Sequence, residues 1–460
     1  MSSPQPHAAS FRDPSGVVFR QGNDIFRRVA APYQPHFDQA VTSGLFKRLI
    51  ADGLMIPHKD VTSEWNDPSA YKVLQPEKVA FISYPYEWSF SQWKDAALLT
   101  LRIQKTAIEH NMTLKDASAY NIQFHKGRPI LIDTLSFETL EEGQPWGAYR
   151  QFCQHFLAPL ALMSHRDIRL GQLARVHIDG IPLNLASSLL PNRTRFSLSL
   201  GMHLHLHAKL QTRHAGNTDI RHTRTARLSR HQLLAIVDGL ERTVASLKWI
   251  PEGTEWADYY QNTNYTNEAQ QLKQTLVGAF LDAHPPHTAW DFGANTGVFS
   301  RLAAARGANT MAFDIDPAAV ELNYRQVRDK QETHMLPLLC DLANPAPSQG
   351  WAHQERDSLL ARGPADLVMA LALIHHLCIG NNVPFTALAA FLRACAPALI
   401  IEFVPREDSQ VQRLLATRKD VFDWYTPENF ETAFGQEFNI ARKSAIPQTA
   451  RTLYLMEAKA

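Results

Sequence analysis

Three aspartates and a glycine-containing turn in the C-terminal half have the chemistry of a nucleotide-binding site. The turn has the sequence D-F-G-A-N-T-G and contains Asp291, Gly293, Asn295 and Gly297. Glycines allow a backbone to turn tightly and to approach a ligand closely. Asp314 and Asp341 end the next two apolar segments, where a carboxylate can accept ribose hydroxyls and a side chain can meet an adenine ring. Three such positions on successive segments are a stronger signal than a glycine turn alone.

Two adjacent histidines follow a fourth apolar segment and could transfer a proton. His375 and His376 lie in the run A-L-A-L-I-H-H-L-C. An imidazole ordinarily titrates near neutrality, so either one could take a proton from a hydroxyl or an amine. The alternative is that one histidine packs internally while the other only lines a pocket. Asn381 and Asn382 come next and either contact a substrate or simply begin a loop.

A parallel β-sheet is the element that would bring these side chains together. Short apolar segments that read as strands cover residues 288–293, 309–315, 336–341, 365–373 and 398–404. Helical patterns separate them, and two are clear, at 298–307 and at 317–330 with proline in its first turn. Apolar strands that alternate with helices predict an α/β domain with a parallel sheet covered on both faces. Ligands bind such sheets at the carboxyl ends of the strands.

The glycine turn and the acids that follow it resemble those of the class I S-adenosylmethionine-dependent methyltransferases. The resemblance covers the C-terminal half and implies a Rossmann-like fold with a mostly parallel seven-stranded sheet. It also implies S-adenosylmethionine as the cofactor. In that family the turn holds the methionyl and ribose portions, a role that falls here on Asp291, Gly293 and Gly297. Asn295 stands where the commonest form of the turn has glycine.

The same resemblance assigns roles to the later strand ends. The acid after the second strand binds the ribose hydroxyls, which implies Asp314. The residue after the third strand faces the adenine, which implies Asp341 with its neighbour Leu342. The family builds its acceptor pocket after the fourth strand, where His375 and His376 lie. These histidines are therefore the predicted catalytic residues, with no choice made between them.

Other sequence features limit the acceptor and the cofactor. A nicotinamide site requires G-x-G-x-x-G, which the turn lacks. The Asn- or Asp-Pro-Pro-Tyr motif of the family's adenine and glutamine N-methyltransferases is also missing. Glu402 either orients a substrate or is a solvated acid at the end of the fifth strand. Tyr259, Tyr260 and Tyr265 resemble an N-terminal lid over the site, or else pack between domains.

The N-terminal half contains a second, looser motif. The pattern predicts a strand and a turn over 79–88, an amphipathic helix over 91–111, a loop and then a hairpin. Asp116, Asn121 and Asp133 have the spacing of a catalytic aspartate and two metal ligands, and the segment resembles protein-kinase-like folds.

Several departures argue against phosphoryl transfer by this half. No G-x-G-x-x-G loop precedes the motif, no strand lysine is evident, and Thr134 and Leu135 replace the usual aromatic residue and glycine. The alternative is that Asp116 and Asn121 form turn hydrogen bonds. The N-terminal half would then serve as an α+β docking or substrate-recognition domain.

A basic stretch lies between residues 191 and 231, opposed only by Asp219. Its basic residues are Arg193, Arg195, Lys209, Arg213, Arg221, Arg224, Arg227 and Arg230. His203, His205 and His207 alternate there, which predicts a strand with a solvated histidine face. Zinc needs three or four converging ligands, which one strand rarely provides, so no metal site is predicted. With few interleaved aromatic residues, nucleic-acid binding is disfavoured.

Length and composition suit a two-domain globular protein. The chain has 460 residues, 45% hydrophobic and 20% charged, with a net charge of +1. Its four cysteines form no CxxC pair, which fits a reducing compartment, and no apolar run reaches the length of a membrane span. We therefore expect a cytoplasmic protein without a membrane partner, with an N-terminal domain over 1–245 and a methyltransferase domain over 246–460.

The function predicted from the sequence is methyl transfer to an oxygen or nitrogen of a small molecule, sugar or protein. The alternative is a catalytically inactive cofactor-binding scaffold around a kinase-like N-terminal module. The whole chain also resembles bacterial proteins that pair this core with an N-terminal domain, some of them named nodulation proteins. That resemblance identifies no acceptor, and the oligomeric state stays open.

Overall fold

The chain forms two compact units. The computed structural model describes residues 5–65, 67–206, 227–251, 267–416 and 418–459. The first unit comprises Met1–Ile250 with Gly350–Arg356, and the second comprises Pro251–Gln349 with Asp357–Ala460. The division lies a few residues beyond the predicted boundary at 245–246, and the sequence did not predict that 350–356 belongs with the first unit. The proposed lid tyrosines, at 259, 260 and 265, lie outside the described residues.

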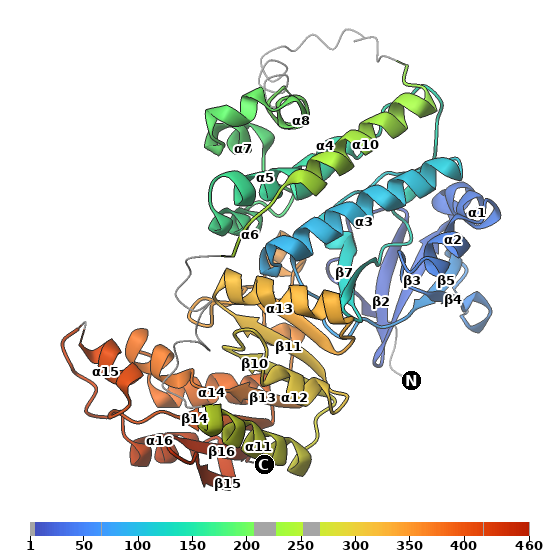
Figure 1. The fold of residues 1–460 in the computed structure, drawn as a ribbon. Helices are drawn as coiled ribbons and strands as arrows, with labels where there is room; N and C mark the ends of the chain where they lie inside the picture. The colour runs from blue at the N-terminus through green and yellow to red at the C-terminus, as the bar shows by residue number, and fades with distance from the viewer. Residues whose placement is uncertain (1–4, 66, 207–226, 252–266, 417, 460) are drawn as a thin grey trace. The chain divides into compact units, whose positions relative to one another are not determined.

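The C-terminal unit is built on a sheet of seven strands in the order β12-β11-β10-β13-β14-β16-β15 (Figure 1). β10 to β14 run parallel, whereas β16 is antiparallel to both β14 and β15. The strand bounds are β10 Thr288–Phe292, β11 Asn309–Asp314, β12 Met335–Leu339, β13 Leu367–Ala370, β14 Ala398–Phe403, β15 Phe438–Ala445 and β16 Thr452–Ala458. The prediction of a mostly parallel sheet is therefore confirmed.

Helices pack on this sheet and bury its central strands. They are α11 Asn267–Ala283, α12 Ser300–Ala304, α13 Pro317–Lys330, α14 Phe385–Cys395, α15 Ser409–Leu415 and α16 Pro427–Phe434. Val277 of α11 joins Met369 and Ile400 in one core cluster, and Val327 of α13 joins Ala312 in another. Because every residue of β13 and β14 is buried, their sequences are continuously apolar apart from one glutamate.

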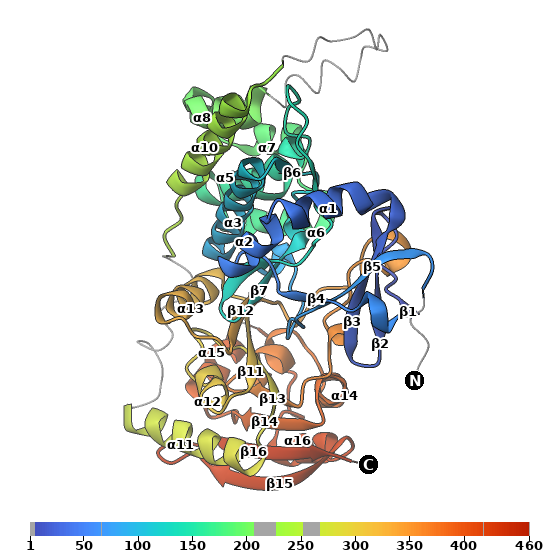
Figure 2. The same cartoon turned by 90° about the vertical axis from the view of Figure 1, so that its right-hand side faces the viewer.

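The N-terminal unit begins with an antiparallel sheet in the order β1-β2-β3-β5-β4 (Figure 2). Its strands are β1 Gln5–Pro6, β2 Gly16–Gln21, β3 Asp24–Ala30, β4 His58–Asp60 and β5 Ala70–Pro76, with α1 Gln34–Thr42 and α2 Leu45–Ala51 between β3 and β4. The predicted amphipathic helix is α3, Phe90–Glu109, and the predicted hairpin is β7 Ile122–His125 with β8 Arg128–Leu131. A further pair joins β6, Met112–Leu114, to β9, Phe137–Thr139.

Helices complete the N-terminal unit. They are α4 Tyr149–Phe152, α5 Ala158–His165, α6 Leu173–Val176, α7 Leu183–Leu189, α8 Leu198–Leu200 and α10 Arg230–Ser246, with π-helical turns at Cys153–Leu157 and Gly201–Leu206. α10 packs along α3. There Lys105 forms ion pairs with Asp238 and Glu241. The N-terminal unit is thus an α+β fold.

Two local predictions for this unit are wrong. Within residues 79–88 the predicted turn is present at Pro85–Glu87. The predicted strand is not formed, because the backbone of Ser83 bonds to the side chain of Gln123 instead of a neighbouring strand. The alternating histidines lie in a π-helical turn, not a strand, and His203 is buried with its Nδ1 2.6 Å from the Tyr149 hydroxyl. Packing against other helices determined the conformation of this segment. The alternation in the sequence could not reveal that packing. His207 lies outside the described residues.

Candidate functional site

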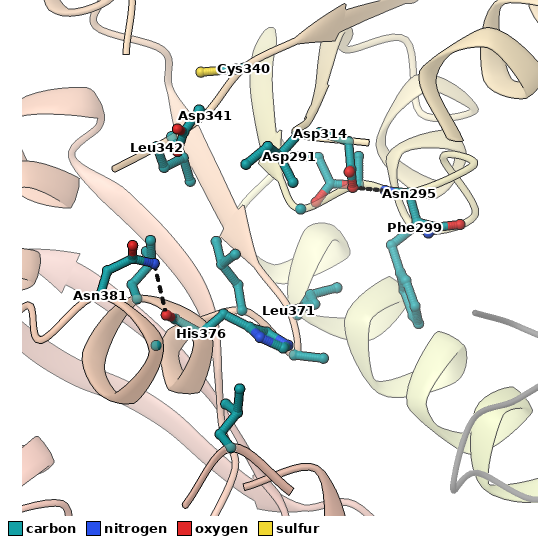
Figure 3. A pocket seen from close by; sticks show the side chains of 18 of the residues that line it. Asp291, Asn295, Phe299, Asp314, Cys340, Asp341, Leu342, Leu371, His376 and Asn381 are labelled. Atoms are coloured by element: carbon teal, nitrogen blue, oxygen red, sulfur yellow. Dashed lines mark hydrogen bonds between the residues drawn. The ribbon is translucent and has the colours of Figure 1, made fainter. Parts of the chain in front are cut away.

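A cavity of about 360 Å³ opens at the carboxyl ends of β10, β11, β12 and β13 (Figure 3). Seven of the nine predicted site residues line it, namely Asp291, Gly293, Asn295, Asp314, Asp341, Leu342 and His376. Gly297 and His375 are not among the lining residues. The strand order brings together side chains that the sequence places tens of residues apart, as expected for a ligand site on a parallel sheet.

The turn after β10 is shaped by three residues with positive φ. Gly293 has φ +73°, Asn295 +49° and Gly297 +80°. A Cβ on Gly297 would lie 2.6 Å from the Asn323 amide nitrogen, so glycine is needed there for space as well as for conformation. Asparagine tolerates the left-handed region better than most residues, which accounts for Asn295 in a place where glycine is common. Gly297 therefore shapes the turn without lining the cavity.

Two buried carboxylates face the turn. Asp314 accepts hydrogen bonds from the backbone N–H groups of Asn295, at 2.7 Å, and Asp316, at 2.8 Å. Burial raises the pKa of Asp314 to about 6, although these hydrogen bonds oppose the shift. Asp291 accepts a 2.5 Å hydrogen bond from the Ser300 hydroxyl. Burial raises the pKa of Asp291 to about 7, and the charge of Asp314 adds to the increase. Without a ligand, the pair is thus partly protonated near neutral pH.

These raised pKa values predict a pH-dependent cost to the folded state. The folded protein binds more protons than the unfolded chain between about pH 4 and 7, so stability contributed by the protonated acids is lost as pH rises through that range. Asp291→Asn mimics the neutral acid. We expect its advantage over the wild type in unfolding free energy to be about 1–2 kcal/mol at pH 5 and about 4 kcal/mol at pH 8. Urea denaturation at both pH values, with the exposed Asp329→Asn as control, measures this difference. An equal difference at both pH values would contradict the assignment.

A buried network of charges lies beside the cavity. The Lys273 ammonium is 2.5 Å from Glu402 Oε2, and the Arg451 guanidinium is 3.2 Å from Glu402 Oε1. Arg451 also contacts Asp408 at 2.7 Å. Glu402 accepts a further hydrogen bond from the backbone N–H of Ala372, which lines the cavity. Of the two interpretations of Glu402, the solvated strand-end acid is wrong, because the residue is fully buried.

Lys273 lines the cavity and was missed by the sequence analysis. Its ammonium lies 4.6 Å from the centre of the Phe299 ring, and burial lowers its pKa. The signal was present in α11, where Lys273 falls at helical spacing from Leu276, Val277 and Phe280 and so shares their apolar face. A lysine on the buried face of a helix is rare unless it is paired.

The two histidines after β13 have different positions. His376 lines the cavity, whereas His375 is buried and its Nδ1 has no hydrogen-bond partner among the described residues. Their ring centroids are 4.1 Å apart. Burial lowers the pKa of His376 to about 4 and that of His375 well below its ordinary value. The expectation that these imidazoles titrate near neutrality is therefore wrong, since both are neutral at pH 7.

The side of the cavity around His376 is mostly apolar. Leu371, Leu373, Leu377 and Leu414 line it, together with Asn381. The Asn381 side chain donates to the carbonyl of His376 at 3.1 Å. Of the two asparagines considered from the sequence, Asn381 therefore reaches the cavity, and Asn382 is not among the lining residues.

The kinase-like motif of the N-terminal unit is engaged in internal bonds. Asp133 forms an ion pair with Arg27 and accepts a 2.9 Å hydrogen bond from Ser136. The Asn121 amide donates to Ser136 at 3.2 Å, and Asp116 accepts from a backbone N–H two residues further on. The turn hydrogen bond considered for Asp116 is thus present. Within the described parts of the chain, no three His, Cys, Asp or Glu side chains group as a metal site would require.

No helix in the described residues combines the length and the apolar character needed to cross a membrane. The basic residues between 207 and 226, which the sequence analysis noted, lie outside the described part of the chain.

Solved methyltransferases align with less than half of the chain. Magnesium protoporphyrin IX methyltransferase from Synechocystis PCC 6803 is 18% identical, covering 44% of this chain and 93% of its own, with a TM-score of 0.33. The N-methyltransferase NodS from Bradyrhizobium japonicum WM9 is 12% identical over 42% of this chain and 98% of its own, with a TM-score of 0.31. The bifunctional kinase-methyltransferase WbdD is 15% identical over 45% of this chain and 43% of its own, with a TM-score of 0.29.

No protein-family model matches this chain. One curated relative, however, covers nearly all of it. Nodulation protein NoeA from Rhizobium meliloti (strain 1021) is 38% identical over 466 residues, which cover 99% of this chain and 97% of that protein. The resemblance to nodulation proteins seen in the sequence is thereby confirmed. The chain belongs to the family of nodulation protein NoeA.

Proposed function

We propose that the protein transfers the methyl group of S-adenosylmethionine to an oxygen or nitrogen of a small molecule, sugar or protein. The observation that carries this proposal is the convergence of Asp291, Asp314 and Asp341 with the glycine turn on one cavity. They occupy three successive strand ends, in the order expected for a nucleoside ligand on a parallel sheet.

The residues present fit this cofactor. Asp314 accepts backbone hydrogen bonds on both of its oxygens. A carboxylate has about four lone-pair sites, so the same group can also accept ribose hydroxyls. Asp341 and Leu342 line the same cavity, and the proposal assigns them to the adenine. At the other end, Asp291 suits the methionyl ammonium and Lys273 suits the carboxylate. When bound, the cofactor supplies an electrophilic methyl group on a sulfonium sulfur.

The chain's own part in the reaction is positioning. Methyl transfer is an in-line displacement, so holding the two reactants in line supplies much of the acceleration. Leu371, Leu373 and Leu377 line the cavity near His376, where we assign the acceptor, and their apolar side chains would exclude water from it. Because His376 is neutral at pH 7, a ring nitrogen can accept a hydrogen bond from an acceptor hydroxyl or amine and orient it. The lowered pKa makes His376 a weak base. This favours an acceptor whose proton is acidic, or an acceptor that loses its proton only after the methyl group has been transferred.

Calorimetric titration tests the cofactor, and a turnover assay tests the transfer. We expect micromolar binding of S-adenosylmethionine and of its demethylated product S-adenosylhomocysteine by the full chain. A screen of alcohols, sugars and amines, read out as S-adenosylhomocysteine formed, then identifies the acceptor class. No binding to the wild type would overturn the proposal. Binding without turnover on any acceptor would favour the cofactor-binding scaffold.

The internal bonds of the kinase-like motif predict that Asp133 does not help the N-terminal unit to bind a nucleotide. Arg27 neutralises the carboxylate that would otherwise hold a magnesium ion. We expect no heat of binding from magnesium-ATP to the full chain, and no change with Asp133→Asn. Magnesium-ATP binding that this substitution removes would show that the unit transfers or senses phosphate.

A further inference from the structure

One segment of the N-terminal unit is anchored by one face and leaves another apolar face exposed. It comprises residues 196–206, which include α8 and the π-helical turn that follows (Figure 1). On the inner face, Leu200, His203 and Leu204 are buried, and the turn packs against α7. The hydrogen bond between His203 and Tyr149 fixes the segment further. The outer face is therefore held in a defined orientation.

Four large apolar side chains of this segment are exposed. Phe196 is 89% exposed and Leu198 88% exposed, while Met202 and Leu206 are each 50% exposed. Leu198, Met202 and Leu206 are spaced by four residues, which places them along one side of a helical segment. Single exposed apolar residues are ordinary, but a contiguous group of them marks a binding surface. We call these four side chains the outer apolar face.

Positive charge accompanies this face, and its own stretch of sequence contains no acidic residue. Residues 191–206 contain Arg193 and Arg195 but neither aspartate nor glutamate. Both arginines are exposed, and within the described residues neither has a carboxylate partner at ion-pair distance. Further along the sequence, up to residue 231, Asp219 is the only acid among six more basic residues. The occupant of this surface should therefore be both apolar and anionic.

We propose that the outer apolar face binds the surface of a membrane rich in anionic phospholipid. The four apolar side chains would enter the boundary between headgroups and acyl chains, while Arg193 and Arg195 remain at the phosphates. The segment lies on the bilayer and does not span it. This surface departs from the sequence-based expectation of a chain without a membrane partner, and it is independent of the proposed methyl transfer.

Charge also argues against a second copy of the chain as the occupant. A symmetric dimer through this face would bring the same patch of both copies together. Arg193 and Arg195 of one copy would then lie near those of the other without acidic groups in the patch to separate them, and such like-charge contacts are costly. An anionic lipid surface satisfies the arginines and the apolar side chains together.

Vesicle co-sedimentation of the full chain tests this proposal. We expect it to sediment with phosphatidylcholine vesicles containing about one third phosphatidylglycerol, but not with phosphatidylcholine alone. Phe196→Ser/Leu198→Ser should lower the partition coefficient about tenfold or more, because the inserted apolar area is lost. Arg193→Gln/Arg195→Gln should lower it too and should weaken its dependence on salt.

A matched control distinguishes binding by this surface from nonspecific adsorption to vesicles. Val176, at the end of α6, is also 76% exposed, and Val176→Ser should leave partitioning unchanged. Thermal unfolding of each variant shows whether it is folded. The proposal would be overturned if the wild-type protein did not bind anionic vesicles, or if a folded Phe196→Ser/Leu198→Ser variant still bound them. A dimer in light scattering that this double substitution converts to monomer would also overturn it.

Discussion

Asp314→Ala should weaken the binding of S-adenosylmethionine and S-adenosylhomocysteine at least about a hundredfold. Hydrogen bonds to an ionised acceptor contribute roughly 1.5–3 kcal/mol each, and every 1.4 kcal/mol is tenfold in affinity. Loss of two such bonds to the ribose therefore removes about 3 kcal/mol or more. Calorimetric titration of the wild type and the variant measures the change directly.

The same substitution has a structural cost that must be separated from the loss of binding. Alanine leaves the backbone N–H groups of Asn295 and Asp316 without their acceptor, at about 1–3 kcal/mol for each buried donor. Asp314→Asn keeps the shape and one acceptor oxygen, so it is the second variant. Asp329→Ala, on the exposed end of α13, is the control and should bind normally. A folded Asp314→Asn protein with wild-type affinity would remove Asp314 from the ribose site.

Glu402→Ala should lower the unfolding free energy by about 3–5 kcal/mol, one of the largest single-residue effects in the C-terminal unit. The buried glutamate neutralises both Lys273 and Arg451. Without it, two positive charges remain in the interior, and Arg451 keeps its ion pair with Asp408. Urea denaturation followed by circular dichroism measures the loss.

Two further variants test whether the charge pairing causes this effect. Asp282→Ala breaks the exposed ion pair with Arg306 and should cost less than about 1 kcal/mol, because solvent screens such pairs. Lys273→Met combined with Glu402→Ala should cost less than the sum of the single changes, since the double variant also removes the positive charge that Glu402 neutralised. A Glu402→Ala protein no less stable than Asp282→Ala would show that the network contributes nothing.

The sequence by itself determined the five parallel strands of the C-terminal sheet and most of the cavity. A buried strand can be recognised from the local sequence, as a continuous apolar run such as that of β13 or β14. The end of the run also shows which residue ends the strand. Since parallel strands end at one edge, placing Asp291, Asp314 and Asp341 at strand ends was enough to predict that they meet. The turn that contains Gly293 and Gly297 was readable for the same reason, because its conformation depends on residue types at adjacent positions.

Tertiary structure alone decided what depends on burial and on distant partners. Lys273 and Glu402 belong to a helix and a strand far apart in the chain, and no local pattern pairs them. The pKa of His376 follows from the apolar walls around it, which reverse what its residue type suggests. Residues 201–206 alternate like a strand yet form a helical turn, because packing of His203 and Leu204 outweighed the local pattern. Desolvation and long-range packing are properties of the folded chain, so these features could not be predicted from residue order.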